Sequence, residues 1–108
     1  MPLEDLLGAP PAAADGGQQV SVRIDNAASQ FFSLVEVRAP DQVGLLYRIT
    51  SGLHALGLDI HHAKIATYAD GALDVFYVRD LEGAKLDEQA AARVSRELSK
   101  RLGGSHAV

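Results

Sequence analysis

Alternation of apolar and polar positions, the period of a half-buried strand, predicts four β-strands in this chain. The predicted strands lie at about 20–25, 32–39, 58–68 and 72–78. Pro40 ends the second strand, because proline has no amide hydrogen to donate to a strand ladder. Between the third and fourth strands, Asp70 and Gly71 are typical of a tight hairpin turn.

The third predicted strand is not regular. Ile60 is out of phase with the apolar set at 63–67, which predicts a β-bulge near His61 or His62. Without a bulge, the two adjacent histidines would point to opposite faces of the sheet.

Two helices are predicted from apolar residues at helical spacing. Asp41 is the predicted N-cap of the first helix, and Gly57 is predicted to end it in a left-handed conformation. Its apolar positions are Leu46, Ile49, Leu53 and Leu56. Asp87 is the predicted N-cap of the second helix, with Leu86 placed to staple onto Ala91. The second apolar stripe is Ala91, Val94, Leu98 and Leu102, followed by Gly103 and Gly104.

The predicted element order is ββαββα, which indicates an α+β fold with one four-stranded antiparallel sheet and both helices on one face. The strand starting near residue 72 should lie in the middle, between the second and third strands. We expect a flexible leader or linker at 1–19, a folded domain at 20–104 and a disordered tail at 105–108.

The fourth predicted strand is apolar on both sides. Leu73, Val75 and Tyr77 oppose Phe76 and Val78. We therefore expect another domain or subunit to cover the second face or an edge of the sheet. The alternative is a few exposed apolar residues, which are common on soluble proteins.

Composition narrows the classes of function. The chain has 108 residues, a net charge of −4 and a pI near 5.4, which does not suit a nucleic-acid or anionic-membrane binder. It has no cysteine, so disulfides and thiolate chemistry are excluded. No apolar run approaches the roughly 18 residues of a membrane span, and no signal peptide is recognisable. We expect a cytoplasmic location.

The segment 39–46 is the most informative for binding, because a strand ends and a helix begins within it. Amides at a helix start lack intrahelical partners, and the helix dipole is positive there. Gly44 would let a carboxylate approach the backbone, and Asp41 could attract an ammonium group, a combination that matches an α-amino acid. Alternatively, Asp41 is only a cap and Gly44 only permits helix–sheet packing.

No pattern in the sequence predicts catalysis or a cofactor. The histidines lack a metal-ligand spacing, and neither a nucleophile elbow nor a phosphate-binding glycine loop is present. RNA-recognition domains share the predicted topology, and Phe76 and Tyr77 are central aromatics. However, Asp74 and Asp80 surround them and the basic signature is missing. We therefore predict neither an enzyme nor a nucleic-acid binder.

Several segments, in order, resemble ACT domains, which are regulatory modules with a ferredoxin-like fold. They are Val35–Asp41, Gly44–Ile49 and Leu56–Ile60. Three more segments narrow the resemblance to the C-terminal ACT domains of bacterial PII uridylyltransferases. These are Asp25–Ser29, Ala63–Tyr68 and Asp74–Val78. The resemblance extends from about Val20 to Leu102.

The resemblance implies a regulatory fragment of an enzyme that attaches and removes uridylyl groups on the PII protein, with glutamine as the effector. ACT domains bind amino acids between paired domains. The residues that the resemblance places at such a site are Asp41, Val43, Gly44 and Leu45 of one domain, with Leu58, Asp59 and Ile60 of the facing domain. The implied partners are glutamine, a second ACT domain (a copy or a sister domain) and the catalytic domains of the parent enzyme.

The sequence departs from the family pattern at two points. Val43 stands where proline often precedes the glycine, and the last strand after the second helix is absent. We expect the strand at 20–25 to take the place of that missing strand. Two alternatives stay open: a docking module that mediates dimerisation without a ligand, and a stand-alone ACT-like protein.

Overall fold

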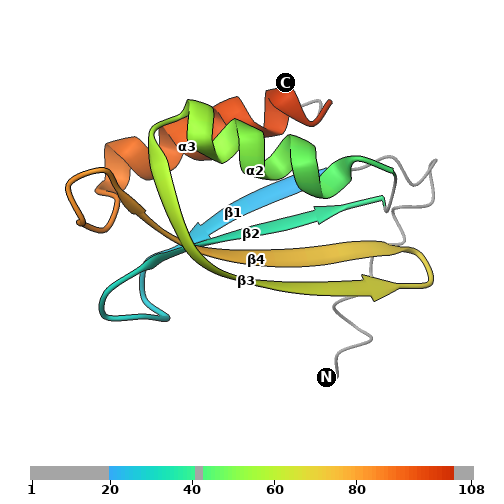
Figure 1. The fold of residues 1–108 in the computed structure, drawn as a ribbon, viewed down its shortest axis with the longest axis horizontal. Coiled ribbons are helices and arrows are strands. Elements are labelled where there is room, and N and C mark those ends of the chain that lie inside the picture. Colours follow the sequence, from blue (N-terminus) through green and yellow to red (C-terminus); the bar gives the residue numbers. More distant parts are fainter. Residues whose placement is uncertain (1–19, 41–42, 104–108) are drawn as a thin grey trace.

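The computed structural model describes residues 20–40 and 43–103, which form one sheet and two helices (Figure 1). In chain order the elements are β1 (Ser21–Asp25), β2 (Ser33–Ala39), α2 (Leu45–Ala55), β3 (Leu58–Tyr68), β4 (Gly71–Asp80) and α3 (Glu88–Arg101). The predicted ββαββα order is confirmed, and the fold is that of a ferredoxin-like α+β domain.

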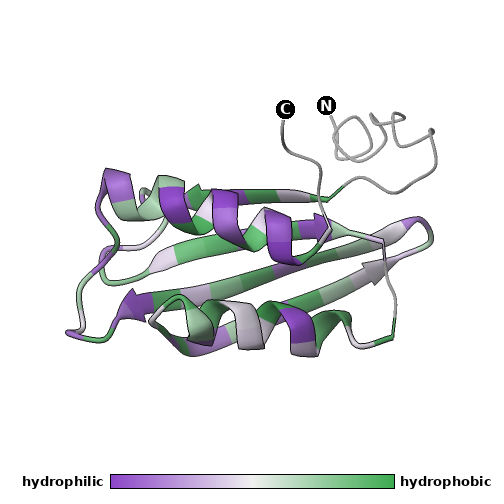
Figure 2. Ribbon diagram, turned by 90° about the horizontal axis from the view of Figure 1, so that it is seen from above, coloured by the Kyte–Doolittle hydropathy of each residue, from purple (hydrophilic) through white to green (hydrophobic). Residues whose placement is uncertain are grey.

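The four strands form a single antiparallel sheet in the order β1-β2-β4-β3, as predicted. β2 and β4 occupy the middle, and β1 and β3 are the edges. Both helices cover one face (Figure 1), and α3 is the more hydrophilic of the two (Figure 2). We call the other side of the sheet the open face.

The core lies between the helices and the covered face of the sheet. The residues of β4 alternate between buried and half-buried, as expected for a strand with one face against the core. Phe76 and Val78 are fully buried beneath the helices, whereas Tyr77 and Val75 are half-buried on the open face. The largest fully buried side chains are Phe76, Ile49, Leu53, Leu98, Val35, Val37, Val78 and Val94.

The predicted β-bulge in β3 is confirmed. The pairing register between β3 and β4 shifts between Ile60 and His62, so His61 is the extra residue. The bulge places both adjacent histidines against aromatic rings of the open face. The His61 ring lies 5.2 Å from the Phe32 ring, and the His62 ring lies 5.3 Å from the Tyr77 ring.

The predicted start of the first helix is wrong. α2 begins at Leu45, and its N-cap is Gly44 rather than Asp41, which lies outside the described residues. The buried face also differs from the predicted one, which included Leu46. Leu45 is buried and Leu46 is 47% exposed.

The helix ends agree with the other predictions. Gly57 follows α2 with φ 84°, the left-handed conformation that the sequence predicted. The carboxylate of Asp87 accepts a 2.7 Å hydrogen bond from the amide of Ala90 at the start of α3. Leu86 is buried beside that cap. The staple of Leu86 onto Ala91 stays a prediction.

A partly buried hydrogen-bond network joins the β1–β2 loop to the segment before α3. The hydroxyl of Ser33, which is fully buried, donates to the side-chain oxygen of Asn26 and accepts from the amide of Leu86 at 2.9 Å. The Lys85 ammonium donates to the carbonyls of Asn26 and Ser29, at 2.7 Å each. The network ties together segments about 60 residues apart in sequence.

Candidate ligand-binding site

The start of α2 presents backbone amides that the helix itself does not use. The first helical hydrogen bond runs from the amide of Arg48 to the carbonyl of Gly44, at 2.9 Å, so the amides of residues 45–47 precede it. Among the described residues, no side chain caps this helix and its first turn holds no carboxylate. The positive end of the helix dipole therefore has no acidic neighbour in its first turn.

The backbone conformation at position 44 explains why this residue is a glycine. Its φ is 83°, the left-handed region that other residues adopt only at a cost. A Cβ added there would meet no described atom within 4 Å. Close helix–sheet packing therefore does not explain this glycine. Gly71 is the contrasting case, because a Cβ there would lie 2.9 Å from the carbonyl oxygen of Ala39.

The structure separates the predicted site residues into two groups. Val43 and Gly44 are exposed at the start of α2, whereas Leu58, Asp59 and Ile60 follow its far end. Eleven helical residues separate the groups by about 16 Å at a rise of about 1.5 Å per residue. One copy of the chain therefore does not bring them together.

The seven predicted residues also differ in burial. Leu45 and Leu58 are buried in the core of their own chain, so their side chains cannot line a site on the surface. Asp59 is exposed and Ile60 is half-buried. Asp41, the predicted ammonium partner, lies outside the described residues.

The β3 edge is a surface that the sequence analysis did not single out. β3 has eleven residues and pairs with β4 alone, so one row of its backbone groups faces outward. From His61 to Tyr68, its residues are exposed on both faces, except for half-buried Ala66. Such a long exposed edge is a template for pairing with another strand.

Exposed apolar side chains lie at the same end of the molecule as the start of α2. Ala39 at the end of β2 pairs with Ala72, which pairs with Thr67, so β2 and β3 end at the same end of the sheet, where α2 also begins (Figure 1). The exposed residues there are Val43, Leu46, Tyr47, Ile65 and Tyr68. The sequence did not predict this exposed group, because its helical spacing placed Leu46 in the core.

No helix within residues 20–40 and 43–103 is long and apolar enough to cross a membrane. Within the same ranges, no three His, Cys, Asp or Glu side chains gather as a metal site requires.

The sheet order β1-β2-β4-β3 with both helices on one face defines a ferredoxin-like domain (Figure 1). A family model described as "ACR9-like, ACT-like domain" matches residues 21–105, and the chain belongs to this ACT-like family.

The similar curated proteins are bifunctional uridylyltransferase/uridylyl-removing enzymes. The chain is 45% identical over 76 residues to the enzyme of Azospirillum brasilense, which covers 70% of the chain and 8% of that enzyme. It is 39% identical over 100 residues to the enzyme of Novosphingobium aromaticivorans, covering 89% of the chain and 11% of that enzyme. The chain thus spans about a tenth of these relatives and is homologous to one segment of them. No solved structure matches it.

Proposed function

We propose that this chain is the amino-acid-sensing regulatory domain of a uridylyltransferase/uridylyl-removing enzyme, and that glutamine is the amino acid it binds. The observation that carries the proposal is the start of α2, where left-handed Gly44 opens onto space and no described side chain occupies the helix end. A ligand carboxylate fits those amides. The homology to a segment of such enzymes supports the choice of parent protein.

A second copy, or a sister domain of the same fold, completes the site. Two β3 edges that pair antiparallel around a two-fold axis place the end of one β3 opposite the beginning of the other. Because α2 starts at the end of the sheet where β3 ends (Figure 1), we expect this pairing to bring Gly44 of one copy toward Leu58, Asp59 and Ile60 of its neighbour. The two groups that one chain holds apart meet between two chains.

Calorimetry with glutamine tests the proposal on the whole chain. We expect a saturable heat with glutamine and association between copies that tightens when glutamine is present, because the ligand bridges both. Glutamate and asparagine serve as comparison ligands. Saturable binding of another amino acid without binding of glutamine would show that the ligand assignment is wrong, while the sensing role would stand.

A matched pair of glycine variants separates ligand contact from backbone strain. Gly44 and Gly83 both have left-handed φ values and open space where a Cβ would go, but Gly83 lies in the β4–α3 loop at the opposite end of the sheet (Figure 1). Each change to alanine should cost about 1–2 kcal/mol of stability. Only Gly44→Ala should weaken glutamine binding, by about tenfold or more, through a lost charge-assisted hydrogen bond. Equal affinities in the two variants would exclude the helix start as the site.

A docking role without ligand is the second candidate, and the exposure of β3 on both faces favours it. In that case light scattering would detect dimers whose stability no amino acid changes. Replacing Ile65, which is 50% exposed on the edge strand, with Lys would then abolish association, and neither this variant nor the parent chain would give a saturable heat with an amino acid.

A further inference from the structure

The open face carries an aromatic–cationic cluster that the proposed sensing site does not use. Its members are Phe32, His61, His62, Lys64, Tyr77 and Arg79. The rings of Phe32 and Tyr77 meet edge to face with centroids 6.1 Å apart, and the two histidine rings flank them. The rings therefore form a continuous aromatic surface. It runs from Phe32, the residue before β2, across β4 to β3.

Two cations of the cluster lie over its rings instead of beside carboxylates. The Arg79 guanidinium is 4.8 Å from the centre of the Phe32 ring, and the Lys64 ammonium is 5.6 Å from that of Tyr77. Arg79 also lies 3.1 Å from Nε2 of His61. Within residues 20–40 and 43–103, neither cation has a carboxylate within ion-pair distance. Asp59, the nearby acid, lies 3.7 Å from His61 instead.

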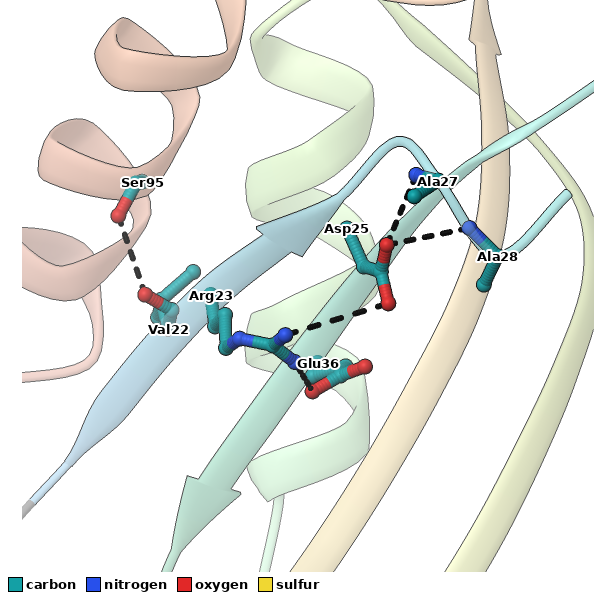
Figure 3. Close-up of polar contacts among 7 residues, drawn as sticks. All are labelled: Val22, Arg23, Asp25, Ala27, Ala28, Glu36 and Ser95. Carbon is teal, nitrogen blue, oxygen red and sulfur yellow. Dashed lines mark hydrogen bonds and ion pairs between the residues drawn. The ribbon is translucent and has the colours of Figure 1, made fainter.

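On the β1 side of the same face, one arginine already has carboxylate partners. Arg23 lies 2.6 Å from Glu36 and 4.0 Å from Asp25, and Asp25 also accepts hydrogen bonds from the amides of Ala27 and Ala28 (Figure 3). The hydrogen bond to Glu36 raises the pKa of Arg23. Among the described residues, Lys64 and Arg79 are thus two cations on the β3–β4 side without a carboxylate at ion-pair distance, although the whole chain carries a net charge of −4.

We infer that the aromatic–cationic cluster docks an acidic polypeptide segment of another domain or protein. Carboxylates of that segment would pair with Arg79 and Lys64, while its apolar side chains cover Phe32 and Tyr77. Aromatic residues and arginine are the types that supply most binding free energy at protein interfaces. Charge complementarity favours an acidic partner, because the cations lack carboxylates of their own.

A nucleic acid fits the same surface less well. Stacking rings and cations also bind single strands. However, a strand carries a charge on every phosphate, whereas the cluster offers only Lys64 and Arg79, with Asp59 opposite Arg79. The surface lies opposite the helices, so this proposal is independent of amino-acid sensing at α2.

Nuclear magnetic resonance titrations of the full chain test the inference with defined probes. The first probe is a short peptide in which Asp and Glu alternate with Phe and Leu. A second peptide has Lys and Arg in place of the acids, and the third probe is a thymidine oligonucleotide of similar length. We expect the acidic peptide alone to shift the amides around Lys64, Tyr77 and Arg79.

Two charge reversals on the same face provide the matched comparison. Lys64→Glu should weaken binding of the acidic peptide about tenfold, as expected for reversing one interfacial charge. Arg38→Glu changes an exposed residue near the other end of β2 and should leave the affinity within about twofold.

Three results would overturn the inference. The acidic peptide could leave the cluster amides unshifted, the basic peptide could bind as tightly, or the oligonucleotide could bind more tightly at the same residues. Equal losses in the Lys64→Glu and Arg38→Glu variants would also overturn it, because they would reflect net charge and not the cluster.

Discussion

Replacing Gly52 with alanine should destabilise the domain, although alanine is the better helix former. Gly52 is buried in the middle of α2, where it faces α3. A Cβ at this position would lie 2.9 Å from Cδ1 of Leu98 and 3.2 Å from Cδ of Arg101. The Arg101 side chain is flexible and can move away. Leu98 is fully buried and has no free space toward solvent.

The magnitude follows from two opposing terms. Alanine gains about 0.8–1.0 kcal/mol over glycine in a helix interior. Overpacking a close-packed core by one methyl group costs about 1–3 kcal/mol. The net expectation is a loss of about 1 kcal/mol, which lowers the melting temperature of a domain this size by roughly 4–8 °C.

Urea unfolding followed by circular dichroism measures this loss, and a double-mutant cycle assigns its cause. Leu98→Val removes the Cδ1 atom that the new methyl group meets, at its own cost of about 1 kcal/mol. The Gly52→Ala/Leu98→Val double variant should therefore lose less stability than the sum of the single changes, by about 1 kcal/mol. A stabilised Gly52→Ala variant, or strictly additive losses, would refute the proposed contact between α2 and α3.

Two further stability predictions concern the polar contacts that join the elements. Ser33→Ala should cost about 1–3 kcal/mol, because it leaves the amide of Leu86 without its acceptor in the core. Denaturant unfolding would contradict this network if the midpoint did not move. Asp87→Ala should cost about 1 kcal/mol by removing the α3 cap, while Asp87→Asn should keep most of it. Thermal melting of both variants checks this, and equal losses would argue against a capping role.

Most of the sheet was predictable because its signals are local. Two-residue periodicity located the strands, and Asp70 with Gly71 located the hairpin. A break in periodicity located the bulge, since an extra residue must reverse the side-chain phase. The strand order β1-β2-β4-β3 followed from the short connections and the split βαβ unit.

The start of α2 and the aromatic–cationic cluster were not predictable in the same way. Asp41 and Gly44 both suit a helix start, and sequence alone does not reveal that Gly44 is the left-handed residue. The cluster depends on cross-strand neighbours. Phe32 and Tyr77 meet only because of the β2–β4 register, and His61 joins them only through the bulge.

One inserted residue links the two surfaces that this domain presents. Without the extra residue His61, the side chains after it in β3 would point to the opposite face of the sheet. Lys64 would then lie on the covered face and not over the Tyr77 ring. The same bulge allows the beginning of β3 to keep Leu58 in the core and Asp59 on the open face. A bulge also increases the local twist of an edge strand, and Leu58–Ile60 lie directly before it. The irregularity in β3 is therefore a shared requirement of the proposed sensing site and the proposed docking face.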